Sequence, residues 1–252
     1  MRRAPRGILH ARMAQRRASL CVVFDAFCSS AYTPDGVAPK LLAVIGDKTK
    51  SAGARIAALW AAEGLGKVDA AVLKPLLTDE NRNVRREAVR AFGEAKLPGM
   101  AAALAALAED PDTTVRAEVI RVCGRVVAKD PQALALCVAM GRDSLSGAAI
   151  NNKGKVPAGD AYDREFERFL VRFFLEKQPQ AVAAWLDSPD AAKLPVEKRL
   201  LASFALEPKT SAKQVAQLLP KLTRPPGQEE VMRLVQFIAE PGVGEALTGA
   251  LT

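Results

Sequence analysis

Residues that could support catalysis or metal binding are few in this sequence. The only histidine is His10, and the four cysteines, Cys21, Cys28, Cys123 and Cys137, lack the close spacing of zinc and covalent haem sites. No glycine-rich phosphate loop is present in the sequence. Neither a Ser/His/Asp nor a Cys/His catalytic set can be assembled from these residues. We therefore expect no enzyme, no metal and no cofactor, and we expect Cys123 and Cys137 to be buried free thiols.

Adjacent carboxylates are the remaining candidates for acid–base chemistry. They occur as Asp79-Glu80, Glu109-Asp110 and Glu229-Glu230. All three pairs fall at expected turns or helix starts, where a carboxylate accepts hydrogen bonds from free backbone amides and favours the helix dipole. The pattern indicates a structural role for these acids.

The charge is concentrated at the N-terminus. The chain carries a formal charge of +8, but residues 1–20 contain six arginines and no acid. The remaining 232 residues hold 30 basic and 28 acidic side chains, so the body of the chain is close to neutral. An excess of positive charge, which binding along a nucleic-acid backbone requires, is therefore not expected over the fold.

Residues 1–36 are expected to form a poorly ordered basic segment. The arginines and the apolar run at residues 18–24 resemble a signal peptide, and Arg16-Arg17 resembles a twin-arginine signal. Asp25 ends that run after seven residues. A run of this length is short for an export core and far below the roughly 20 residues needed to span a bilayer. No membrane span is expected.

A sequence pattern recurs at a spacing of 31 residues. Residues 72–93 read VLKPLLTDENRNVRREAVRAFG and residues 103–124 read ALAALAEDPDTTVRAEVIRVCG. The matched positions are Asp79, Val84, Arg85 and Gly93, which return as Asp110, Val115, Arg116 and Gly124. A looser copy occupies residues 38–66. Each copy has a short apolar segment, a polar turn and an amphipathic segment, which predicts the helix–turn–helix unit of a solenoid.

This pattern resembles that of HEAT repeats, in which a short apolar helix is followed by Asp and then by Val-Arg at the start of a second helix. The resemblance implies an all-α solenoid, a right-handed superhelix of helix pairs, with regular repeats over residues 37–140. It also implies a structural ladder in which Asp79 with Arg85, and Asp110 with Arg116, tie one inter-helix turn to the next.

The regular repeat stops near residue 140. A fourth first helix is expected at residues 133–140, and residues 141–161, rich in Gly, Asn, Ser and Lys, are expected to form either a simple loop insertion or a functional loop. Residues 162–177 predict the strongest amphipathic helix, whose apolar stripe is expected to face the core. That stripe is Tyr162, Phe166, Phe169, Leu170, Phe173 and Phe174. Degenerate helix pairs follow over residues 162–252, and the unpaired last segment suggests a fragment of a longer chain.

A second resemblance concerns residues 162–176. They are similar to a Tyr-(Asp/Glu)-Arg-Glu-Phe-Glu-Arg segment that follows HEAT repeats in large exported dehydrogenase-like cytochrome c fusion proteins of planctomycetes and verrucomicrobia. The resemblance implies a helical spacer between functional modules and an exported or periplasmic location; without it, the expected location is cytoplasmic. The chain has no Cys-x-x-Cys-His motif, so haem binding does not follow.

We therefore expect a non-enzymatic scaffold that contacts a protein partner or spaces flanking domains. One alternative is binding of a nucleic-acid backbone by a basic HEAT surface, which the neighbouring acids disfavour. Another is a HEAT-type lyase or protein-modification factor with its pocket where residues 141–161 meet Tyr162 and Arg164. The candidate interaction surface comprises Arg82, Arg86, Arg90, Arg121, Tyr162 and Arg164.

Overall fold

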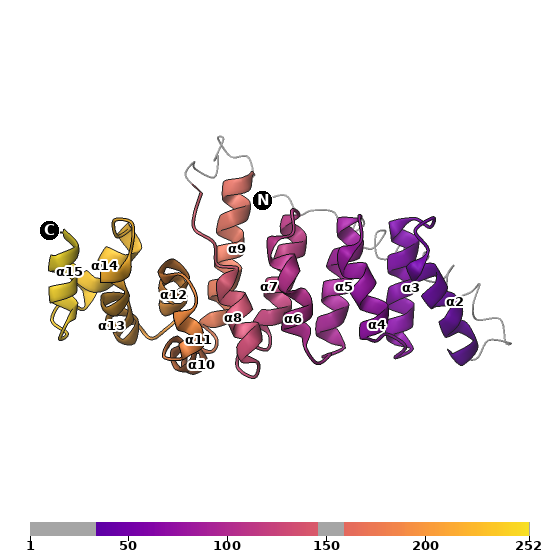
Figure 1. Cartoon of the computed structure of the whole chain (residues 1–252), viewed down its shortest axis with the longest axis horizontal. Coiled ribbons are helices and arrows are strands. Elements are labelled where there is room, and N and C mark those ends of the chain that lie inside the picture. The colour runs from indigo at the N-terminus through magenta and orange to yellow at the C-terminus, as the bar shows by residue number, and fades with distance from the viewer. Residues whose placement is uncertain (1–33, 146–158, 252) are drawn as a thin grey trace, which may run out of the picture. The chain divides into compact units, whose positions relative to one another are not determined.

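The computed structural model describes residues 34–145 and 159–251, and every regular element in those two ranges is a helix (Figure 1). The chain divides into two units, residues 1–91 and residues 92–252. Helix α5, Arg82–Glu94, begins in the first unit and ends in the second. The all-α solenoid expected from the repeat is the observed fold class.

The first unit contains one complete helix pair and the start of the next. Helices α2, Pro34–Gly46, and α3, Ala52–Gly64, pack against each other across a short turn. Helix α4, Ala70–Leu73, continues as the 3₁₀ helix η1, Lys74–Thr78, before α5. The side chain of Ser51 caps α3 and that of Asp69 caps α4, which satisfies backbone amides that each helix leaves free.

The second unit begins with the more regular repeat. Helix α6, Met100–Leu104, continues as η2, Ala105–Glu109, and is followed by α7, Thr113–Gly124, and α8, Pro131–Ala139. Asp112 and Asp130 cap α7 and α8 through their side chains. Helix α9, Asp160–Leu175, follows the segment that is not described and packs on α7. Two second helices of successive repeats therefore lie side by side in this unit.

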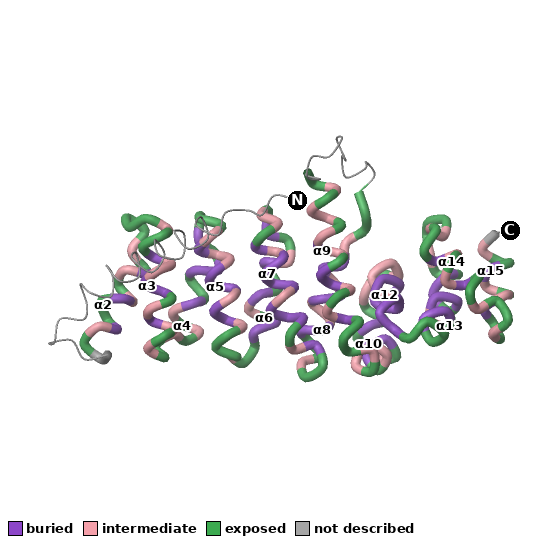
Figure 2. The backbone as a smooth tube through the Cα atoms, turned by 180° about the vertical axis from the view of Figure 1, so that it is seen from behind, coloured by how far each residue is buried: buried purple, intermediate pink, exposed green. Residues whose placement is uncertain are grey.

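The rest of the second unit is built from shorter helices. Helices α10, Pro179–Leu186, and α12, Val196–Ser203, pack together around the single turn α11, Pro189–Ala192. Helix α13, Pro208–Leu218, extends as η3, Leu219–Lys221, and packs on α14, Gln228–Gln236, and α15, Val243–Leu251. Their shared core includes Leu200, Val215, Leu234 and Val243. Figure 2 shows buried residues where helices face each other and exposed residues at the turns.

The glycine that recurs at the end of each second helix allows the next one to approach closely. A Cβ added at Gly93 would lie 2.8 Å from Val122 of α7, and one added at Gly124 would lie 2.3 Å from the ring of Phe174 on α9. Both distances are below ordinary van der Waals contact. The repeated Gly93 and Gly124 are therefore packing positions between neighbouring second helices.

The expected segments can be compared with the observed helices only where the structure describes them. Residues 1–33 of the basic segment and residues 146–158 of the expected loop lie outside the described residues. The aromatic helix runs from Asp160 to Leu175 rather than over residues 162–177. The first helix of each regular repeat is split into a short α-helix and a 3₁₀ turn.

Candidate functional site

Asp79 joins the turn before α5 to the preceding helix pair. Its Oδ2 accepts a hydrogen bond from Arg55 Nη2 at 2.6 Å, and Arg55 Nε donates to the Ile45 carbonyl at 2.9 Å. The other oxygen, Oδ1, accepts from the Asn81 amide at 2.9 Å. Burial raises the pKa of the Asp79 carboxyl, but the hydrogen bonds from Arg55 and Asn81 outweigh it and hold that pKa below its usual range. Asp79 is therefore a buried, charged connection between two repeats.

Arg85 and Arg116 bind the main chain of their own turns. Arg85 Nη1 donates to the Asp79 carbonyl at 2.8 Å and to the Glu80 carbonyl at 3.1 Å. Arg116 Nη1 donates to the Asp110 carbonyl at 2.5 Å. In each repeat the Val-Arg motif thus closes its own inter-helix turn, and the carboxylate of Asp79 is held by Arg55 of the repeat before it.

Glu167 of α9 accepts the forward contact from α7. Its Oε1 accepts from Arg116 Nε at 2.7 Å and its Oε2 accepts from Arg142 Nη2 at 2.6 Å. The residue is 1 % exposed. Thr113 at the start of α7 also donates to Asp163 Oδ2 at 3.1 Å. Glu167 therefore takes, across the long segment between α8 and α9, the role that Asp79 has for Arg55.

Sequence reasoning did not single out Glu167 or Arg142. The available signal was the position of Glu167 on the helical wheel, one turn from Leu170 and Val171, which are both buried. A wheel centred on the aliphatic residues rather than on the aromatic ones would have placed this glutamate on the buried face.

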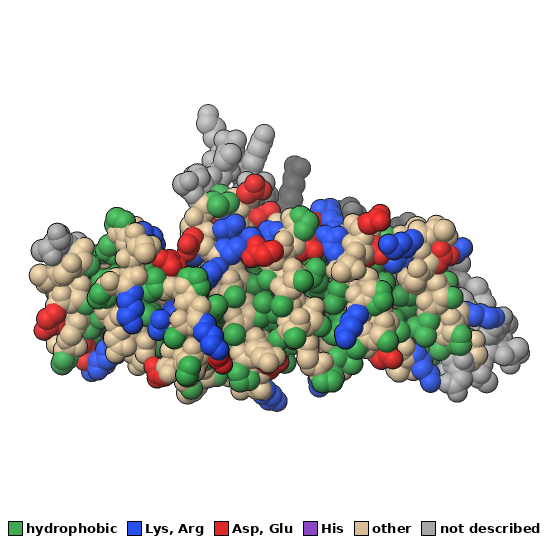
Figure 3. Space-filling model, in the orientation of Figure 1, with side chains coloured by type: hydrophobic (Ala, Val, Ile, Leu, Met, Phe, Trp, Pro, Cys, Tyr) green, Lys and Arg blue, Asp and Glu red, His purple; other side chains and the backbone are tan. Residues whose placement is uncertain are grey.

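The arginines of the expected interaction surface are engaged with neighbouring acids. Arg90 Nε donates to Glu87 Oε2 at 2.8 Å, and Arg90 also pairs with Glu63 of the preceding helix. Arg86 Nη2 reaches Glu87 Oε1 at 3.2 Å. Arg121 Nη1 donates to Glu118 Oε2 at 3.0 Å. Basic and acidic side chains are mixed on the face drawn in Figure 3, and the exposed Arg82 opens helix α5.

The aromatic stripe of α9 does not face the core, so that expectation is wrong. Glu167, Leu170, Val171 and Leu175 form the buried face. Of the aromatic residues, Phe169 is 59 % exposed, Phe173 39 % and Tyr162 38 %. The physical reason is the ion-pair network: burying Glu167 between Arg116 and Arg142 turns the opposite side of α9, which carries the aromatic rings, toward solvent.

The exposed rings on α9 contact one another. The rings of Phe169 and Phe173 stack with centroids 6.0 Å apart, and Phe174 meets Phe173 edge-on at 5.2 Å. Lys177 Nζ lies 3.7 Å from the centroid of the Phe173 ring, within cation–π range. We call Tyr162, Phe169 and Phe173 the aromatic face of α9. It is an exposed apolar surface on a helix that is otherwise well anchored.

Beside Glu167 lies a group of basic side chains that we call the cationic corner, Arg142, Arg164 and Lys198. Arg164 Nη1 donates to the Asp143 carbonyl at 2.8 Å, and Arg142 binds Glu167. Lys198, in the first turn of α12, is half-buried and has no carboxylate within ion-pair distance among the described residues. Burial lowers the pKa of Lys198, Arg142 and Arg164 lower it further, and Asp143 opposes them. The corner also joins Arg164 to the start of the expected loop.

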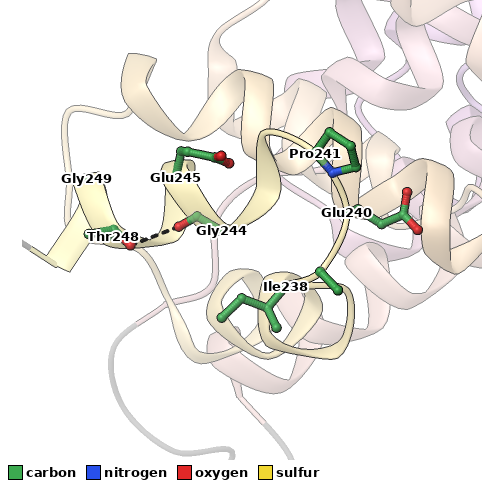
Figure 4. A pocket seen from close by; sticks show the side chains of 8 residues that line it. Ile238, Glu240, Pro241, Gly244, Glu245, Thr248 and Gly249 are labelled. Carbon is green, nitrogen blue, oxygen red and sulfur yellow. Dashed lines mark hydrogen bonds between the residues drawn. The ribbon is translucent and has the colours of Figure 1, made fainter.

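Catalytic geometry is not apparent in the part of the chain that the structure describes. No group of three or more His, Cys, Asp or Glu side chains there could hold a metal ion. A shallow pocket between α14 and α15 contains two acids, Glu240 and Glu245 (Figure 4). Glu240 Oε1 lies 2.7 Å from Lys209 Nζ, and this contact holds the pKa of Glu240 below its usual range. A carboxylate that stays ionised in this way is poorly suited to act as a general acid.

Comparison with known proteins identifies the repeat. Residues 70–147, from α4 to just beyond α8, match the family model of HEAT repeats. No curated protein matches the chain, so the likeness of residues 162–176 to exported planctomycete and verrucomicrobial proteins stays a prediction. No helix within the described ranges is both long and apolar enough to cross a bilayer. The match supports a HEAT-repeat protein, a class that commonly serves as a protein-interaction scaffold.

Proposed function

We propose that this chain is a non-enzymatic scaffold that binds another protein along its helical repeats. The observation that carries the proposal is the aromatic face of α9, where Phe169 is 59 % exposed beside Phe173 and Tyr162. Exposed aromatic side chains that cluster on one rigid element are characteristic of protein interfaces. The buried contacts of Glu167 hold α9 in this orientation, so the rings are presented on a fixed helix.

The contacts of the arginines favour this function over nucleic-acid binding. A protein that follows a phosphate backbone needs basic side chains whose charge is not already neutralised. Arg86, Arg90 and Arg121 each pair with a glutamate of their own or the preceding helix. A phosphate would have to displace those glutamates before it could bind.

Spacing of flanking modules is a second form of the same scaffold function. The likeness of residues 162–176 to a segment of large exported proteins supports it. In a stack of helix pairs each pair contacts its neighbours, so the distance between attached modules is set by the number of pairs.

The test is affinity capture on the immobilised full chain from a lysate of the source cells, with bound proteins identified by mass spectrometry. The variant Phe169→Ser/Phe173→Ser should lose a partner that the wild type retains. Met232→Ser is the matched control, because Met232 is 50 % exposed on α14 and its loss removes a similar apolar area outside α9. Retention of every captured protein by the double serine variant would remove the observation that carries the proposal.

A second arm decides between protein and nucleic acid. Fluorescence anisotropy of a labelled DNA duplex is titrated with the full chain at low and at high salt. The residues 1–20 arginines will produce weak binding of their own, so Arg86→Gln/Arg90→Gln is compared with the wild type. Equal curves support the scaffold; a large loss in the variant would overturn it in favour of a nucleic-acid surface.

A further inference from the structure

Lys198 differs from the other basic residues around α9 in having no acidic partner. Arg116 and Arg142 share the carboxylate of Glu167, and Arg168 has Glu165 at 3.6 Å. Arg164 spends a hydrogen bond on a neutral carbonyl, that of Asp143. Lys198 is half-buried and unpaired within the described residues. A half-buried ammonium without a counter-charge is costly, and a bound anion would remove that cost.

The charges that act on Arg164 and Lys198 leave a small positive surplus. Four cations, Arg116, Arg142, Arg164 and Lys198, face three carboxylates, Glu109, Asp143 and Glu167. Glu197, next to Lys198 in the chain, lies near Arg224 and is not within ion-pair distance of Lys198. The neighbouring pair of Arg224 with Glu230, at 2.6 Å, adds no net charge. The surplus is therefore one positive charge.

The start of helix α12 adds to this preference for an anion. Lys198 lies in its first turn, and the N-cap residue, Pro195, makes no side-chain hydrogen bond to the helix. Free amides and the helix dipole at an uncapped N-terminus favour negative charge nearby. Two independent features, an unpaired lysine and an uncapped helix start, thus favour an anion at the same place.

We propose that the cationic corner, Arg142, Arg164 and Lys198, binds a carboxylate of an acidic segment in a partner protein. The proposal rests on the protein-binding function and names the chemistry of the partner. A carboxylate carries one negative charge and so matches the surplus of one. A phosphate dianion carries more charge and would be repelled by Asp143 and Glu109, which belong to the same corner.

The test is anisotropy of fluorescein-labelled hexaglutamate titrated with the full chain. Hexaglutamine and a phosphoserine hexapeptide are titrated in parallel. We expect hexaglutamate to bind better than both, and we expect Lys198→Met to weaken its binding roughly ten-fold through loss of one charge-assisted contact. Lys129→Met is the control, because Lys129 is exposed and its replacement removes the same charge elsewhere in this unit. That control also corrects for anion binding by the N-terminal arginines.

Each outcome has a defined meaning. Equal binding by Lys198→Met and Lys129→Met would overturn the site, as would the absence of hexaglutamate binding. Tighter binding of the phosphoserine peptide, lost in Lys198→Met, would replace the carboxylate by phosphate. Arg164→Met serves as a second variant if Lys198→Met does not reproduce the wild-type circular dichroism. Loss of the site with retained partner capture by the aromatic face would leave the scaffold function intact, whereas duplex DNA bound through Lys198 would overturn both.

Discussion

Replacing Glu167 by glutamine should destabilise the second unit although the side chain keeps its size. The carboxylate accepts from two guanidinium groups, Arg116 Nε at 2.7 Å and Arg142 Nη2 at 2.6 Å. A glutamine has one carbonyl oxygen, so it can serve one arginine while its NH₂ group faces the other donor. The substitution therefore removes a negative charge and one acceptor from a site that is 1 % exposed.

The magnitude follows from what remains for the two arginines. Removing one partner from a buried ion pair costs about 3–5 kcal/mol. Arg142 is partly exposed and has Glu109 Oε2 at 3.5 Å as another partner, which reduces the cost. Arg116 retains the Asp110 carbonyl. We therefore expect a loss of about 2–3 kcal/mol, which lowers the Tm by roughly 5–10 °C for a unit of this size.

Urea and thermal denaturation followed by circular dichroism measure this loss. Glu165→Gln is the matched control, because it makes the same chemical change on the same helix at an exposed position whose nearest arginine, Arg168, is 3.6 Å away. The control should change stability by less than about 0.5 kcal/mol. If Glu167→Gln were no less stable than Glu165→Gln, the assignment of Glu167 as the link between α7 and α9 would be refuted.

Three further predictions concern packing, pH and thiol reactivity. Gly124→Ala should cost about 1–3 kcal/mol in urea denaturation, because its Cβ would meet the ring of Phe174, whereas Gly53→Ala, with open space around it, should not destabilise the protein. Because the pKa of Asp79 is lowered in the fold, its contribution to stability is complete above the unfolded-state value of about 3.9 and is lost as pH falls through the folded-state value. The urea midpoint should therefore fall more steeply on acidification in the wild type than in Asp79→Asn. Burial raises the pKa of Cys123 to about 12, so peptide-level mass spectrometry should show no iodoacetamide adduct at this residue unless urea is added.

The regular repeats could be predicted from the sequence because their determinants are local. The offset of 31 residues brings back the apolar spacing, the turn aspartate and the glycine together. The buried positions Val84 and Val115 follow from the helical period alone. A description of residues 72–124 therefore needed no knowledge of distant contacts.

The face that α9 buries could not be predicted in the same way. Hydrophobic periodicity assigns Phe169 and Phe173 to the core and Glu167 to solvent. The structure reverses this assignment because Arg116 and Arg142, 51 and 25 residues before Glu167, neutralise it. A pattern within one helix carries no information on such long-range partners.

The cationic corner was missed for a related reason. Lys198 follows Glu197 in a mixed-charge helix start, a context that predicts an ordinary solvated lysine. Its environment comes from three separate elements, the chain after α8, helix α9 and helix α12. The expected pocket where residues 141–161 meet Tyr162 and Arg164 included only one of the three basic residues of the corner.

The contact of Arg116 with Glu167 has a mechanical consequence. In a stack of repeats, force applied along the chain passes through the interfaces between neighbours, and the weakest interface yields first. The long segment between α8 and α9 would be a natural place for such a rupture, since covalent spacing there transmits no tension between the two repeats. The salt bridges of Glu167 with Arg116 and Arg142 instead couple the two repeats directly, and they lie nearly perpendicular in sequence to the path of the backbone: one side chain connects residues 51 apart. Helices α7 and α9 should therefore respond to tension as one element.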